Sequence, residues 1–103
     1  MGSVWYPNPD TRAAIKNISK SMNISEYEAV VKFSEIVYCI TMKCADVIHL
    51  NELTYEYGAL YAYILKKAIE CAEHNFESDD FDSFVPQYAD SVLKELWRKM
   101  TNG

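Results

Sequence analysis

The sequence predicts an all-α fold: a four-helix bundle-like domain with a long central antiparallel helical hairpin and an extended N-terminal arm. Two observations carry this prediction. Apolar residues recur at helical spacing along most of the chain, and helix breakers are rare, with three glycines and three prolines in 103 residues. Half of the residues are hydrophobic, enough for one core, so we expect a single helical domain over residues 1–103.

The N-terminal arm, residues 1–8, cannot be regular helix because prolines bracket Asn8. We expect its two large aromatic residues to lie across the bundle. A first helix is expected at about 9–22. Asn8 has the residue type of an N-cap, Pro9 suits the first helical position, and Asp10 favours the positive end of the helix dipole.

A second helix is expected at about 25–49, and Ser25 with Glu28 has the spacing of a capping box at its start. The helix is apolar apart from one narrow polar stripe, which consists of Glu28, Lys32, Glu35, Lys43 and Asp46. A helix of this composition needs cover on most sides, so we expect it to be the central one. A chain of this size leaves part of it uncovered, which indicates a homodimer.

A third helix is expected at about 53–76, followed by an acidic and aromatic connector. The fourth helix, at about 83–100, has an amphipathic stripe formed by Tyr88, Val92, Leu93, Leu96, Trp97 and Met100.

The third helix carries four tyrosines, and a helical wheel divides them between two directions. Tyr57 and Tyr61 fall toward the core, whereas Tyr55 and Tyr63 point outward and flank the small residue Ala59. Because tyrosine is enriched at protein interfaces, we predict Tyr55, Ala59 and Tyr63 as interaction residues. The alternative is that the N-terminal arm covers the outer pair.

The chain is acidic, with a formal net charge of −5. An acidic surface repels nucleic acid, so we expect the partner to be another protein and not a nucleic acid. The connector supplies the remaining predicted interaction residues, Glu77, Asp79, Asp80, Phe81 and Asp82. A basic partner surface, such as that of a nucleic-acid-binding protein, would suit them, although they also fit a solvated connector.

Candidate catalytic and metal-binding groups are few. Cys44, His49, Cys71 and His74 are the possible zinc ligands, but the expected hairpin separates Cys44 from Cys71 by about 16 Å. One zinc ion cannot bridge that distance, and no glycine-rich phosphate loop is present. We therefore expect no enzyme activity, no cofactor and no metal.

The three cysteines form an odd set in apolar context, which is typical of free thiols in a reducing compartment. No secretion signal and no apolar run long enough to span a membrane is evident. A cytoplasmic protein without membrane contact is therefore expected.

Two alternative functions remain open. Residues 15–33 are similar in outline to a helix–turn–helix of a DNA-binding regulator, with Lys16 and Lys20 as possible phosphate contacts, but Glu26 and Glu28 at the second helix start have the wrong sign. The other alternative is a small-molecule-binding bundle with a pocket near Tyr57, Tyr61 and Cys71. The sequence favours a non-catalytic, acidic protein–protein interaction domain that acts as an inhibitor or regulator.

Overall fold

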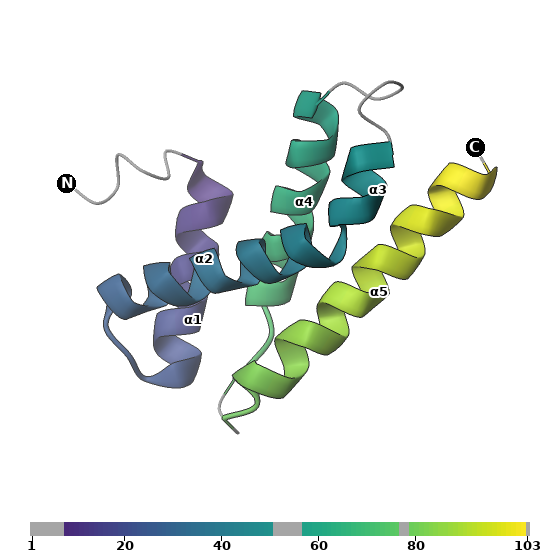
Figure 1. The fold of residues 1–103 in the computed structure, drawn as a ribbon. Helices are drawn as coiled ribbons and strands as arrows, with labels where there is room; N and C mark the ends of the chain where they lie inside the picture. The colour runs from purple at the N-terminus through teal and green to yellow at the C-terminus, as the bar shows by residue number, and fades with distance from the viewer. Residues whose placement is uncertain (1–7, 51–56, 77–78, 103) are drawn as a thin grey trace.

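The computed structural model describes residues 8–50, 57–76 and 79–102, with backbone alone at 48–50, 57–60 and 100–102. All regular secondary structure in these ranges is helical (Figure 1). The helices are α1 (Pro9–Met22), α2 (Glu26–Lys43), α3 (Ala45–Leu50), α4 (Tyr57–Ala72) and α5 (Phe81–Asn102). The all-α prediction is confirmed for this part of the chain; of the N-terminal arm, it includes only Asn8.

Helix α1 begins and ends with caps that the residue types explain. The Asn8 side chain accepts a hydrogen bond of 2.8 Å from the Asp10 amide, and Pro9 occupies the first helical position. At the other end Asn23 adopts the left-handed conformation, with φ 57°, and the Ile24 amide donates to the Ser19 carbonyl at 3.0 Å. The predicted bounds of this helix are confirmed.

Helix α2 begins with the predicted capping box. The Ser25 hydroxyl oxygen accepts a hydrogen bond of 3.1 Å from the Glu28 amide, and the Glu28 carboxylate accepts one of 3.4 Å from the Ser25 amide. These bonds satisfy two of the backbone donors that a helix start leaves free.

The predicted helix at 25–49 is interrupted at Cys44, where the backbone has φ −95° and ψ 7°. The chain changes direction there, and α3 leaves α2 at an angle (Figure 1). Cys44 and Val47 are both fully buried, so the bend folds this apolar segment back onto the core. A one-dimensional apolar pattern does not reveal such a bend because the residues on both sides remain helical.

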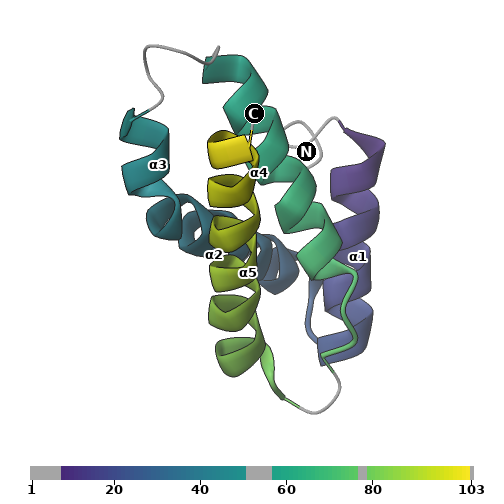
Figure 2. The ribbon, with the colours of Figure 1, turned by 90° about the vertical axis from the view of Figure 1, so that its right-hand side faces the viewer.

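Helix α2 is the central helix, in contact with each of the other helices. It lies across α1 and α4, which run side by side behind it, while α5 packs along another side (Figures 1 and 2). The expected long antiparallel hairpin of the second and third helices is therefore not observed in the described residues. The crossing arrangement covers α2 with α1 and α4 on one side and with α5 on another.

Helix α4 ends at Ala72, earlier than the predicted end at 76, because the chain turns to bring Phe76 into the core. Asn17 of α1 stabilises this end: its side-chain amide donates to the Ala72 carbonyl at 2.8 Å and to the His74 carbonyl at 3.4 Å. Helix α5 begins two residues earlier than predicted and contains Pro86.

The buried core draws on every helix. Its largest fully buried side chains include Phe33 at the middle of α2 and Phe76 after α4. None of the helices in the described ranges is both long enough and apolar enough to cross a bilayer.

Candidate interaction surface

Helix α2 has apolar residues on two opposite sides. Its inner side consists of fully buried residues, namely Ala29, Phe33, Ile36 and Ile40. On a helical wheel the opposite side carries Tyr27, Val31, Tyr38 and Met42, with Ser34 between the middle two. We call these five residues the outer face of α2. A surface helix ordinarily has polar residues in that position.

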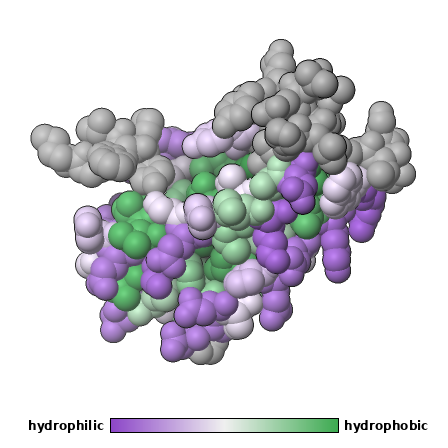
Figure 3. Space-filling view, in the orientation of Figure 1, coloured by the Kyte–Doolittle hydropathy of each residue, from purple (hydrophilic) through white to green (hydrophobic). Residues whose placement is uncertain are grey.

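The outer face is exposed to solvent. Tyr27 is 79% exposed, Tyr38 67%, Met42 56% and Val31 45%. In Figure 3 hydrophobic residues gather along the part of the surface where α2 crosses the molecule, and hydrophilic residues lie around them. Isolated exposed apolar residues are common, but four large ones on one helix face form a patch of the kind that marks interaction sites.

Charged residues lie on the side of α2 between the outer face and α5. Lys32 and Glu35 form an ion pair of 3.8 Å. Lys43 pairs with Asp90 of α5 at 2.9 Å, and the hydrogen bond and charge of Asp90 raise the pKa of the Lys43 ammonium group. This side of α2 therefore carries both signs of charge, whereas the outer face itself carries none.

Of the predicted tyrosine site, Tyr55 lies outside the described residues, and only the backbone of Ala59 is described. Tyr63 is half-buried, because its hydroxyl donates a hydrogen bond of 3.1 Å to Glu95 of α5 and its ring lies under the ammonium groups of Lys67 and Lys99. Burial and the Glu95 carboxylate raise the pKa of Tyr63. The expectation that Tyr63 points freely outward is wrong: it joins α4 to α5.

Tyr61, which the wheel assigned to the core, is 56% exposed. The N-terminal turns of α4 extend beyond α2 (Figures 1 and 2), so helix phase alone does not bury a residue there. The Tyr57 side chain lies outside the described residues.

The connector residues have separate roles. Phe81 is only 4% exposed and packs against Phe76 with ring centroids 5.2 Å apart, so it belongs to the core and not to an exposed site. Asp80 lies at the start of α5, and its Oδ2 is 2.9 Å from His74 Nε2. Its Oδ1 is buried without a hydrogen-bond partner among the described residues.

The remaining acidic residues of the connector differ in what the structure shows. Asp79 and Asp82 are exposed, and Asp79 has a positive φ of 56°. Glu77 lies outside the described residues.

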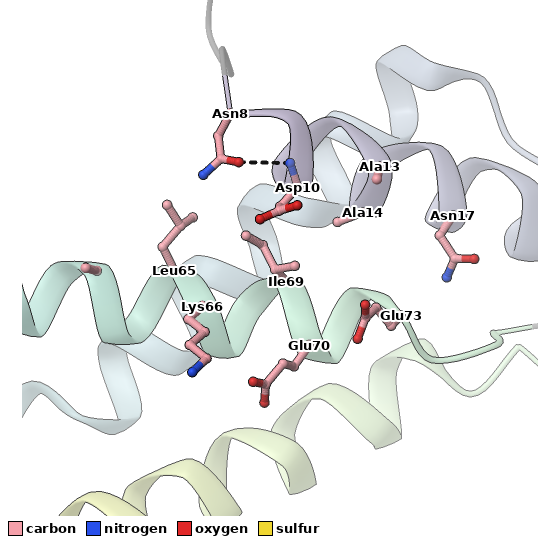
Figure 4. A pocket seen from close by; sticks show the side chains of 11 residues that line it. Asn8, Asp10, Ala13, Ala14, Asn17, Leu65, Lys66, Ile69, Glu70 and Glu73 are labelled. Carbon is pink, nitrogen blue, oxygen red and sulfur yellow. Dashed lines mark hydrogen bonds between the residues drawn. The ribbon is translucent and has the colours of Figure 1, made fainter.

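A groove of about 810 Å³ lies between α1 and α4 (Figure 4). Leu65 and Ile69 point from α4 toward α1, where Ala13 and Ala14 leave space because their side chains are small. The charged lining residues are Asp10, Lys66, Glu70 and Glu73. No pattern in the sequence predicts this groove, because its walls come from helices that are far apart in the chain.

The groove does not coincide with the pocket predicted near Tyr57, Tyr61 and Cys71. Among the described side chains, neither Tyr61 nor Cys71 lines it. The groove runs between the two helices and is open to the surface. Figure 4 shows apolar and acidic side chains along its walls.

The candidate nucleophile Cys71 is fully buried, and burial raises the pKa of its thiol to about 12. The thiol therefore stays protonated at neutral pH and is a poor nucleophile. His74, another of the possible zinc ligands, has its ring stacked on Phe84 with a centroid distance of 3.7 Å and contacts Asp80. Within the ranges that the structure describes, no group of three or more His, Cys, Asp or Glu residues could hold a metal ion.

No protein-family model matches the chain, and neither the curated proteins nor the solved structures include a significant match. Interpretation of the surface therefore depends on its own geometry and chemistry.

Proposed function

We propose that this chain is a non-catalytic protein–protein interaction domain whose binding surface is the outer face of α2. One observation carries the proposal: four large apolar side chains are exposed together on the central helix, opposite its buried side. An apolar patch that remains in water is unfavourable for a free domain, and covering it with a partner stabilises the complex.

The composition of the outer face supports a protein partner. Tyrosine and methionine are enriched at protein interfaces, and charged residues are depleted from interface centres. Here two tyrosines and a methionine occupy the face, while Glu35 lies at its margin. The arrangement has the apolar centre and polar rim of a protein-binding surface.

The environment of Cys71, the best candidate for a nucleophile, supports the proposed absence of catalysis. Cys71 is buried and protonated, and the ring of His74 is held by Phe84 and Asp80. A nucleophile needs access to a substrate and a base that is positioned to activate it. Neither condition is met at this pair.

A capture experiment tests the proposal. Full-length chain is immobilised and exposed to extract of the native host, and retained proteins are identified and quantified by mass spectrometry. Tyr38→Glu places a charge at the centre of the outer face. Tyr61→Glu is the matched control, because Tyr61 is an exposed tyrosine of similar accessibility on α4.

We expect Tyr38→Glu to lose a protein that the wild type and Tyr61→Glu both retain. Circular dichroism establishes that both variants are folded. Equal retention by the two variants, or no specific retention by the wild type, would refute the outer face as a binding surface.

In its more specific form, the proposal is that the domain inhibits or regulates a partner protein by binding a basic segment of the partner's surface. The net charge is −5, and exposed Asp79 and Asp82 lie beside the start of α5. Asp10 and Glu73 add exposed carboxylates at the α1–α4 groove. Lysine or arginine side chains would find carboxylates both there and at the connector.

The salt dependence of partner binding tests this electrostatic form. Asp79→Asn with Asp82→Asn, and separately Asp10→Asn with Glu73→Gln, should weaken binding of the retained protein and reduce its sensitivity to salt. Unchanged salt sensitivity in both double variants would eliminate a basic partner while leaving the α2 surface intact.

The DNA-binding alternative is less well supported. Helices α1 and α2 are joined by a short turn, as in a helix–turn–helix, but the exposed start of α2 presents Glu26, Tyr27 and Glu28. These carboxylates would meet phosphates with like charge. A duplex-binding assay at low salt distinguishes the alternatives, because an interaction domain of this charge should not bind.

A further inference from the structure

We infer that the α1–α4 groove binds an amphipathic helix of a partner protein, with apolar residues on the side that enters the groove and lysine or arginine along its flanks. The inference rests on the basic-partner form of the proposed function, because it names the site and the shape of that basic segment. It is independent of the outer face of α2, since none of the described residues of α2 lines the groove.

The groove presents apolar side chains at helical spacing. Ala62, Leu65 and Ile69 lie three and four residues apart on α4, so they share one side of that helix. Leu65 and Ile69 are half-buried and point toward α1 (Figure 4). Ala13 and Ala14 lie across the groove from them, and their small side chains leave space for another residue. An apolar side chain that entered this space would leave water and contact Leu65 and Ile69.

The direction and length of the walls suit a helix. Helices α1 and α4 run side by side (Figure 2), and the lining on the α4 side extends from Ala62 to Glu73, about 16 Å at 1.5 Å per residue. A helix of three turns has that length, and it docks in a groove through apolar residues three and four positions apart. Addition of an extended strand requires a sheet edge, and the described residues form no sheet.

The charges of the lining favour a basic segment. Among the described lining residues, the carboxylates of Asp10, Glu70 and Glu73 outnumber the single ammonium group, that of Lys66. Glu70 is already paired with Lys67 at 3.4 Å. Asp10 and Glu73 are both exposed, and neither takes part in the ion pairs of the described residues. Lysine or arginine side chains of a partner helix would supply the missing countercharges.

Glu73 occupies a position where a carboxylate does not stabilise the fold. It follows Ala72, the last residue of α4, at the negative end of the helix dipole, where a cation is favourable and an anion is not. Asp10, by contrast, lies in the first turn of α1 and stabilises that helix. An effect of Glu73 on binding can therefore be separated from an effect on folding.

Fluorescence polarisation with labelled synthetic peptides tests the inference on the full chain. The first peptide has about 12 residues, or a little over three helical turns, with leucine at every third or fourth position and lysine at the others. In the second, glutamate replaces each lysine, and the third has the composition of the first in scrambled order. We expect the chain to bind the first peptide at low salt, with a gain of helical circular dichroism, and to bind neither of the others. Equal binding of all three would overturn the inference.

A substitution that fills the groove tests the site. Ala13→Leu places a larger side chain opposite α4 and should weaken binding of the lysine peptide by about tenfold or more, because the peptide and the new side chain compete for the same space. Gln87→Leu is the matched control, since it adds leucine at an exposed position of α5 outside the groove. Equal affinity of the two variants for the peptide would refute the groove as the binding site.

A charge substitution tests the recognition of basic residues. Glu73→Gln should weaken peptide binding by roughly two- to fivefold at low salt, as expected for one exposed ion pair. The same variant should keep or slightly raise the urea midpoint, because it removes an unfavourable charge from the end of α4. Asp46→Asn is the control, because it removes an equal charge at an exposed position of α3. Equal weakening by both variants would show attraction to the acidic chain as a whole and would overturn the inference.

The N-terminal arm is the competing occupant, because residues 1–7 directly precede Asn8, which lines the groove. Trp5→Ala combined with Tyr6→Ala removes the two large aromatic side chains of the arm. Equal peptide affinity of this variant and the wild type would support a partner helix. If only the variant bound the peptide, the arm would be the occupant and the inference would be wrong.

The inference and the proposed function fail in different ways. If capture from extract depends on Tyr38 while Ala13→Leu leaves peptide binding unchanged, the groove is excluded and the outer face of α2 stands. If Ala13→Leu weakens peptide binding while Tyr38→Glu leaves capture unchanged, the groove stands and the outer face is excluded. If neither substitution has an effect, both proposals are wrong.

Discussion

The Tyr63 hydroxyl on α4 and the Glu95 carboxylate on α5 are joined by a hydrogen bond of 3.1 Å. The same Glu95 oxygen lies 3.2 Å from the Lys67 ammonium group, which also pairs with Glu70 at 3.4 Å. Tyr88 of α5 completes the connection by donating to Glu70 at 3.2 Å. This polar network holds α4 and α5 together outside the apolar core.

Glu95→Gln should destabilise the protein at neutral pH by about 0.5 kcal/mol, a small value because the side chain is well exposed and its ion pair is screened. The hydrogen bond from Lys67 lowers the pKa of Glu95 against the opposing effect of burial, and Tyr63 adds to the lowering. The folded state therefore binds this proton less readily than the unfolded state.

The sign of this shift fixes the pH dependence. The contribution of Glu95 is fully present above the ordinary glutamate pKa, about 4.3, and is lost as pH falls through the lowered folded-state value. Urea unfolding at a series of pH values should show the stability difference between wild type and Glu95→Gln shrinking in that acidic range. A difference that grows on acidification would contradict this assignment.

The two sides of α2 should respond differently to truncation. Phe33→Ala creates a cavity in the core and should destabilise the protein by about 3–5 kcal/mol. Val31→Ala, on the outer face of the same helix, should change the free energy of unfolding by no more than about 0.5 kcal/mol. Chemical denaturation of the two variants and the wild type makes the comparison. Similar losses for both would refute the proposed exposure of Val31.

The end of α1 depends on a left-handed residue at Asn23, with φ 57°. Asn23→Gly should be tolerated or slightly stabilising, since glycine adopts this conformation without steric cost. Asn23→Ala should cost about 1 kcal/mol, because alanine keeps the β-carbon that is unfavourable in this conformation but lacks the short polar side chain with which asparagine can hydrogen-bond locally. Thermal unfolding of the pair checks the expectation, and a more stable alanine variant would contradict it.

The cysteines should differ in reactivity. Cys44 and Cys71 are fully buried, whereas Cys39 is half-buried. Burial raises the pKa of all three thiols, most strongly that of Cys71, to about 12. Thiol labelling at neutral pH, followed by mass spectrometry, should modify Cys39 slowly and the other two only after unfolding. Rapid native-state labelling of Cys71 would contradict its burial.

Local signals in the sequence determined much of the helical structure. Asn8 and the Ser25–Glu28 capping box identify helix starts because they satisfy free backbone donors within a few residues. Pro9 suits the first helical position because it has no backbone N–H that would need a partner there. The unusually apolar composition of α2 also indicated that it is the central helix. Each of these features is determined by residues that are close together in the sequence, so it can be predicted without knowledge of the tertiary structure.

Tertiary structure decided which residues form the candidate surface. The wheel for the third helix placed Tyr61 inside and Tyr63 outside. A wheel gives the direction of each side chain, but not how far along the helix a neighbouring helix covers that side. The bend at Cys44, the burial of Phe81 and the exposure of Tyr38 likewise depend on how helices cross. Packing of residues distant in sequence fixes those crossings, and no local pattern records them.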